Sequence, residues 1–273
     1  MRIAQRFADL KKQNRAGFVA FISAGDPNYD TSLEILLGLP KAGADIIELG
    51  MPFTDPMAEG PAIQASSLRA LKAGQTMAKT LAMVRRFRES DTTTPIVLMG
   101  YYNPIYSFGV DKFSSEAHAA GVDGLIIVDL PPEEDHELRV PAKSAGLDLI
   151  RLATPTTDAR RLPTVLDGAT GFLYYVSIMG VTGTKSINPA DMTAALKRIK
   201  AATSLPVAVG FGIKTEADAA AVAKSADAAV VGSALVSEIA RFVGPGSKVS
   251  PGAAQAVLSL TRRLADAAHG ARN

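Results

Sequence analysis

Hydrophobic positions along the chain fall into short runs that recur at intervals and are separated by amphipathic stretches. Some runs are apolar at consecutive positions, as in 126–128 (Ile-Ile-Val) and 207–209 (Val-Ala-Val). Parallel strands that are covered by helices on both faces show this pattern. Eight strands are predicted, at Gly17–Ser23, Asp45–Leu49, Pro95–Gly100, Gly124–Asp129, Asp148–Leu152, Phe172–Ser177, Pro206–Gly210 and Ala228–Gly232.

Alanine-rich stretches between these runs have the apolar spacing of amphipathic helices. Gly43, Gly121 and Gly146 follow three of them, and glycine commonly ends a helix because it adopts positive φ angles without strain. In the last stretch Ser250 is a candidate N-cap, with Pro251 as the first helical residue. The predicted helices are Thr31–Lys41, Thr76–Arg88, Lys112–Ala120, Pro132–Ser144, Asp191–Ala202, Thr215–Ala223 and Ser250–His269.

Eight β–α repeats favour a closed (β/α)8 TIM barrel, with residues 1–273 as a single domain. A doubly wound open sheet is the alternative, but no predicted strand is followed by the GxGxxG fingerprint. Ile3, Phe7 and Leu10 have helical spacing and predict an extra N-terminal helix that covers the bottom of the barrel. The longest intervals between strand starts, from 45 to 95 and from 172 to 206, predict long βα loops 2 and 6.

Composition excludes several classes of partner. The chain is 47% hydrophobic and 21% charged, with a net charge of +2, so nucleic acid is not an expected ligand. The densest basic cluster, Arg85, Arg86 and Arg88, falls on a predicted helix and is read as a solvated face.

The chain contains no cysteine, which excludes disulfides, thiolate nucleophiles and cysteine-ligated zinc. Its first residues lack the apolar run of a signal peptide. No apolar stretch reaches the ~18 residues that a membrane span requires. We therefore expect a cytoplasmic protein with no membrane partner.

A carboxylate stands at the end of the second predicted strand, where apolar residues would be expected. Glu48 follows Ile46 and Ile47 in a run that is otherwise destined for the interior. Burial raises the pKa of a carboxyl group and suits it to general acid–base catalysis. The alternative is a structural glutamate bonded to a neighbouring amide or hydroxyl group.

The loop after this strand carries two further acidic residues, Asp55 and Glu59, among Pro52, Pro56 and Pro61. Proline stiffens a loop and lowers the entropy cost of holding it closed. An ordinary solvated loop with acidic helix caps is the alternative interpretation.

Glycine-rich segments follow the last three predicted strands, at 177–184, 210–214 and 232–234. Bare backbone amides at helix N-termini favour an anion, and barrels commonly bind phosphate after strands 7 and 8. Together these segments predict a phosphate site.

Histidine and lysine are absent from the predicted strand ends. His118, His136 and His269 fall on outer helices, whereas Lys185 and Lys214 lie farther out in loops. A histidine base, a metal site and a Schiff-base lysine are therefore disfavoured. Carboxylate acid–base catalysis on a phosphorylated substrate, without a cofactor, remains.

Several of these segments together resemble the tryptophan synthase α subunit family. They are 18–27 (FVAFISAGDP), 48–64 (ELGMPFTDPMAEGPAIQ), 180–183 (GVTG), 210–213 (GFGI) and 231–234 (VGSA). They occur in the family's order and spacing, and the similarity covers essentially the whole chain. The segment 48–64 is highly specific, whereas the glycine motifs alone would fit many phosphate-binding barrels.

The resemblance implies retro-aldol cleavage of indole-3-glycerol phosphate to indole and glyceraldehyde 3-phosphate. Glu48 matches the catalytic glutamate, and Tyr174 a tyrosine beside it. Glu59 matches a position where the family usually has aspartate, the group that stabilises or removes the indole N–H proton. The positions matching the indole site are Phe21, Ile63, Met99, Tyr101, Asp129 and Phe211, and those matching the phosphate cradle are Gly183, Gly212, Gly232 and Ser233.

The resemblance also implies a partner, a β subunit that carries pyridoxal phosphate and receives the indole within an αββα heterotetramer. No cofactor is expected in this chain. Loops 2 and 6 would close over the substrate, with Asp55 and Thr182 meeting on closure. The exposed side of 52–56 and the strand-3 loop 103–106 are candidate docking surfaces, or else ordinary packed loops.

Two other functions stay open at this point. One is a stand-alone lyase that releases free indole, which turnover with and without a β subunit would distinguish. The other is a weakly catalytic barrel that serves mainly as a binding and activating subunit, to which only the Glu59 replacement points. Another phosphosugar enzyme, such as an isomerase or epimerase, would not need the segment 48–64.

Overall fold

The computed structural model describes residues 1–176, 189–210 and 212–272, with the side chains of 189 and 190 left out. Its strands are all parallel and form one sheet in the order β5-β4-β3-β2-β1-β9-β8-β7-β6. The strands are β1 Gly17–Ser23, β2 Ile46–Gly50, β3 Ile96–Gly100, β4 Gly124–Ile127, β5 Asp148–Leu149, β6 Arg151–Ala153, β7 Leu173–Val176, β8 Val207–Gly210 and β9 Ala228–Val231.

The sheet is closed by a single extended segment, 148–153, in which Ile150 separates β5 from β6. β5 pairs with β4, and β6 pairs with β7. The amide of Ile150 also donates to the carbonyl of Leu125 over 2.9 Å. The two edges of the sheet therefore meet at one predicted strand, and the predicted eight-stranded barrel is confirmed.

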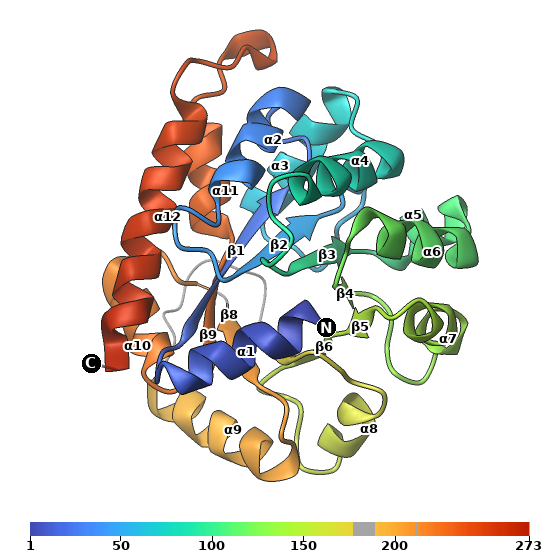
Figure 1. The fold of residues 1–273 in the computed structure, drawn as a ribbon, viewed down its shortest axis with the longest axis vertical. Helices are drawn as coiled ribbons and strands as arrows, with labels where there is room; N and C mark the ends of the chain where they lie inside the picture. The colour runs from blue at the N-terminus through green and yellow to red at the C-terminus, as the bar shows by residue number, and fades with distance from the viewer. Residues whose placement is uncertain (177–188, 211, 273) are drawn as a thin grey trace.

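Helices surround the strands on the outside, except α1, which lies across one end of the barrel (Figure 1). They are α1 Arg2–Lys12, α2 Tyr29–Gly38, α3 Pro61–Lys72, α4 Met77–Arg88, α5 Tyr102–Phe108, α6 Val110–Ala120, α7 His136–Ser144, α8 Leu162–Leu166, α9 Pro189–Ala202, α10 Glu216–Ala223, α11 Ser233–Ala240 and α12 Ala253–His269. In the part of the chain that the structure describes, none of them is long and apolar enough to span a bilayer.

Alternation along the strands divides the core into an outer and an inner part. Ala20 and Ile22 of β1 pack outward with the helices, whereas Val19 belongs to a separate cluster inside the barrel. That inner cluster includes Phe7 of α1, whose ring centroid lies 5.7 Å from that of Phe172. The predicted role of the N-terminal helix as a plug for the barrel bottom is confirmed.

Two local predictions were wrong. α12 begins at Ala253 after Gly252, which has φ 90° and gives no side-chain cap, so Ser250 is not the N-cap. The segment 103–106 is not a loop but part of α5, because the Asp129 carboxylate accepts a hydrogen bond from the Tyr102 amide at 2.8 Å and caps this helix. Pro104 fits in the first turn, where no amide donor is needed.

Candidate active site

Glu48 lies inside the mouth of the barrel, on the inner face of β2. It is in register with Phe21 of β1 and Val97 of β3 and is only 1% exposed. Its Oε1 has no hydrogen-bond partner among the described residues. Burial, and then the nearby charge of Glu59, raises the pKa of Glu48 to about 8. The carboxyl group is therefore mostly protonated at neutral pH and can donate a proton.

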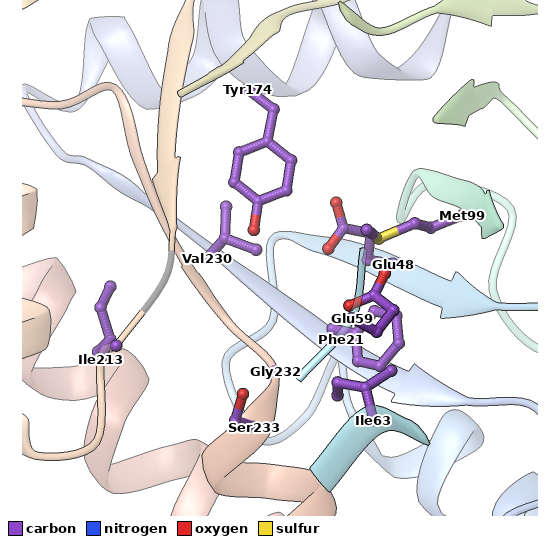
Figure 2. Close-up of a pocket in the computed structure, with 11 residues that line it drawn as sticks. Phe21, Glu48, Glu59, Ile63, Met99, Tyr174, Ile213, Val230, Gly232 and Ser233 are labelled. Carbon is purple, nitrogen blue, oxygen red and sulfur yellow. The ribbon is translucent and has the colours of Figure 1, made fainter. Parts of the chain in front are cut away.

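Glu59 reaches the same space from the loop between β2 and α3. Its amide donates to the Pro56 carbonyl at 3.0 Å, and its own carbonyl accepts from Gln64 Nε2 at 2.8 Å, so the backbone is fixed on both sides. Burial raises the pKa of Glu59 to about 7. Figure 2 shows the two carboxyl groups next to each other on one side of the pocket.

Tyr174 enters the pocket from β7, on the opposite side (Figure 2). It is buried, and its ring and hydroxyl group lie too close to residue 210 to leave room for a Cβ atom there, so Gly210 is required for this packing. Burial and the charges of Glu48 and Glu59 raise the pKa of Tyr174 well above its usual value. The hydroxyl group therefore stays protonated.

These groups line one pocket at the carboxyl ends of the strands. Its wall is mostly apolar apart from the two carboxyl groups and two hydroxyl groups, and no cation lines it among the described residues. The predicted site residues that the structure brings together here are Phe21, Glu48, Glu59, Ile63, Met99, Tyr174, Gly212, Gly232 and Ser233.

Glycines form the end of the pocket that is suited to an anion. Gly212 has φ +80°, and Gly232 is the N-cap of α11 without any side-chain cap hydrogen bond. A Cβ atom at Gly232 would lie 3.3 Å from the Phe21 side chain, so a larger residue would narrow the pocket. The first amides of α11, beginning at Ser233, and the helix dipole favour a negative group.

The neighbouring helix α10 differs in this respect. Thr215 and Asp218 form a capping box at its N-terminus, and Asp218 also accepts from the Lys214 amide at 3.1 Å. An aspartate already satisfies these donors and supplies the negative charge. Of the N-termini of α10 and α11, that of α11 is therefore the one suited to phosphate.

Three predicted residues lie outside this pocket. Tyr101 lines an adjoining recess, where its hydroxyl group accepts a hydrogen bond from the Ala58 amide at 3.0 Å. Asp129 is exposed and caps α5. Asp55 is exposed on the rim and bonded to the hydroxyl group of Thr54. The remaining predicted site residues, Thr182, Gly183 and Phe211, lie outside the described residues.

Among the described residues that line the pocket, sequence reasoning missed Ile213 and Val230. Val230 follows from alternation along β9, since Ala228 and Val230 belong to the inner cluster. The predicted helical positions of the histidines are confirmed, because His118, His136 and His269 lie on α6, α7 and α12. Among the described residues no group of three potential metal ligands occurs.

Comparison with known proteins gives a consistent result over nearly the whole chain. The family model for the tryptophan synthase alpha chain matches residues 7–268. Tryptophan synthase subunit alpha from Legionella pneumophila is 41% identical, with 97% of each chain covered and a TM-score of 0.88. A Mycobacterium tuberculosis tryptophan synthase chain is 33% identical, with 98% of each chain covered and a TM-score of 0.87. A protein from Aquifex aeolicus is 32% identical, with 97% of this chain and 98% of that chain covered and a TM-score of 0.88.

Proposed function

Because the chain belongs to the tryptophan synthase alpha chain family, we propose that the pocket of Glu48 and Glu59 is the place where the family's reaction occurs. The chain is a lyase of tryptophan biosynthesis that cleaves indole-3-glycerol phosphate to indole and glyceraldehyde 3-phosphate. It needs no cofactor of its own, since pyridoxal phosphate is carried by the β subunit. We place this activity in the cytoplasm, in keeping with the cysteine-free sequence.

Glu48 is the proton donor and acceptor in this proposal. Its proton, retained at neutral pH by a pKa of about 8, is transferred to C3 of the indole, which becomes an electron-poor indolenine. The C3–C3′ bond then breaks, and its electron pair returns to the ring. The Glu48 carboxylate removes the proton of the C3′ hydroxyl group as the aldehyde forms, so Glu48 ends the cycle protonated.

Glu59 acts on the ring nitrogen. Protonation at C3 leaves positive charge on that nitrogen, and a carboxylate beside it stabilises this charge, or accepts the N–H proton and returns it as the indole ring re-forms. The pKa of Glu59 is about 7, so a substantial fraction is ionised at neutral pH while Glu48 remains protonated. Two neighbouring carboxyl groups with different proton affinities supply an acid and a base on one side of the pocket.

The phosphate group binds at the glycine-lined end of the pocket, on Gly212, Gly232 and Ser233. The uncapped N-terminus of α11 supports this placement. Because the phosphate group binds away from the bond that breaks, its binding energy can hold the substrate in place and orient the reacting bond.

The observation that carries the proposal is the buried Glu48 carboxyl group, which faces the same pocket as Glu59 and whose Oε1 has no hydrogen-bond partner among the described residues. A crystal structure with a non-cleavable indolyl alkyl phosphate tests it. We expect the phosphate at the α11 N-terminus, C3 of the ring next to Glu48 and the ring nitrogen next to Glu59. A ring bound away from both carboxyl groups would refute these assignments.

The β subunit is the partner of this family's α subunit, and we propose that it docks over the loop after β2 and helix α5. Met57 and Tyr106 are 79% and 62% exposed, and each follows the carboxyl end of one of two adjacent strands. Exposed apolar side chains at one rim are suited to an interface.

Titration of the β subunit against charged variants tests this surface. Met57→Glu and Tyr106→Glu should each weaken binding about tenfold or more. Val140→Glu, at a 47% exposed position on α7, is the matched control and should bind normally. Equal binding by all three variants would contradict the proposed surface.

A further inference from the structure

A small recess adjoins the pocket behind Glu59. Both spaces are lined by Phe21, Glu59, Ile63 and Met99. Glu59 therefore stands between the two spaces. The other residues that line the recess are Ser23, Gly50, Met51, Pro56, Ser67, Gly100 and Tyr101.

Ser23 presents an unsatisfied hydroxyl group in this recess. It is the last residue of β1 and, by strand alternation, lies on the same inner face as Val19 and Phe21. The residue is 2% exposed, and its Oγ has no hydrogen-bond partner among the described residues. A buried hydroxyl group without a partner costs free energy, so such groups are usually bonded to protein or water.

The Glu59 carboxylate also has an open hydrogen-bonding capacity. Within the described part of the chain, the hydrogen bonds of this residue are made by its backbone, to Pro56 and Gln64. A carboxylate has two oxygens that accept hydrogen bonds, so one can face the recess while the other faces the pocket.

From this geometry we propose that Ser23 is a positioning residue for Glu59. The Ser23 hydroxyl group donates a hydrogen bond to the Glu59 carboxylate across the recess, directly or through one water molecule. This inference rests on the proposed function, because Glu59 is the group held toward the ring. The second oxygen of Glu59 is then left facing the substrate.

The other titratable groups around Glu59 cannot supply this stabilisation by charge. Glu48 of β2, Tyr101 after β3 and Tyr174 of β7 interact with Glu59 electrostatically. No cation lines the pocket or the recess among the described residues. Tyr101 and Ser67 are the competing hydroxyl donors in the recess, and the hydroxyl group of Tyr101 already accepts from the Ala58 amide. A hydrogen bond to the ionised carboxylate lowers its pKa.

The test is a ¹³C NMR titration of side-chain-labelled glutamate in the full chain, with the Glu59 signal assigned by its loss in Glu59→Gln. Ser23→Ala should raise the pKa of Glu59 by about 1, the size expected for a hydrogen bond to a charged group. Ser23→Thr keeps the hydroxyl group, so the pKa of Glu59 in this variant should equal that in the parent chain. Ser114→Ala removes a buried serine on α6 and is the control that should change nothing.

Kinetics provide a second readout. Ser23→Ala should lower kcat about tenfold with little change in KM, because the phosphate end is untouched. The proposal would be overturned if the pKa of Glu59 were unchanged in Ser23→Ala, or if that pKa rose in Tyr101→Phe alone. The NMR result does not depend on cleavage. Full activity of Glu59→Gln would therefore refute the catalytic role of Glu59 while leaving the Ser23 contact testable.

Discussion

Replacing Glu48 by glutamine should remove nearly all turnover while increasing stability at neutral pH. Glutamine has the size of glutamate and is neutral, as Glu48 mostly is at neutral pH with a pKa of about 8. Cleavage requires a group that gives up a proton and takes one back, which an amide cannot do. General acid–base catalysis contributes about 10²–10⁴-fold, so kcat should fall by about that factor.

The stability effect follows from the pKa of Glu48. Burial is the main cause that raises this pKa from 4.5 to about 8 in the folded chain. Such a group contributes stability that is fully present below its unfolded pKa and is lost as the pH rises through the folded pKa. At about 1.4 kcal/mol per pKa unit, the loss is at most about 5 kcal/mol. Glutamine does not ionise, so Glu48→Gln avoids this loss.

Urea denaturation at about pH 5 and about pH 9 measures this difference, and indole release measures turnover. The stability of Glu48→Gln relative to the parent chain should grow by several kcal/mol between the two pH values. Glu34→Gln, at an exposed position on α2, should show no such growth. A stability difference that is the same at both pH values would refute the buried-carboxyl argument, and normal indole release would refute the catalytic role.

Three further substitutions test the surroundings of the site. Gly210→Ala adds a Cβ atom that clashes with the ring and hydroxyl group of Tyr174, so we expect about 1–3 kcal/mol lower stability in urea and slower indole release. An unchanged urea midpoint would contradict this packing. Asp26→Asn disrupts the buried pair in which Arg69 donates two 2.8 Å hydrogen bonds to Asp26. Calorimetry should show a free energy of unfolding that is lower by about 3–5 kcal/mol. A decrease below about 1 kcal/mol would speak against a buried ion pair. Ser233→Asp adds negative charge at the α11 N-terminus and should raise KM about tenfold or more at nearly constant kcat; an unchanged KM would place the phosphate elsewhere.

Local pattern predicted the fold where the signal lies within one element. The apolar run at Gly17–Ser23 gave the bounds of β1, and the spacing of Ile3, Phe7 and Leu10 gave α1. α5 was missed because its cap comes from Asp129, which follows the next strand. A cap supplied by another strand leaves no mark in the sequence of the helix itself.

For the site, too, some features follow from the local sequence and others depend on the tertiary structure. Sequence by itself determined which side chains stand at the strand ends, because alternation along β2 puts Glu48 on one face whatever surrounds it. Tertiary structure alone decided that Glu59 lies beside Glu48 and that, among the described residues, Glu48 Oε1 has no hydrogen-bond partner. It also decided that the described side chains cap α10 but not α11. Burial and the distance between charges depend on strands that are far apart in the chain, and they set the proton affinities on which the proposed chemistry depends.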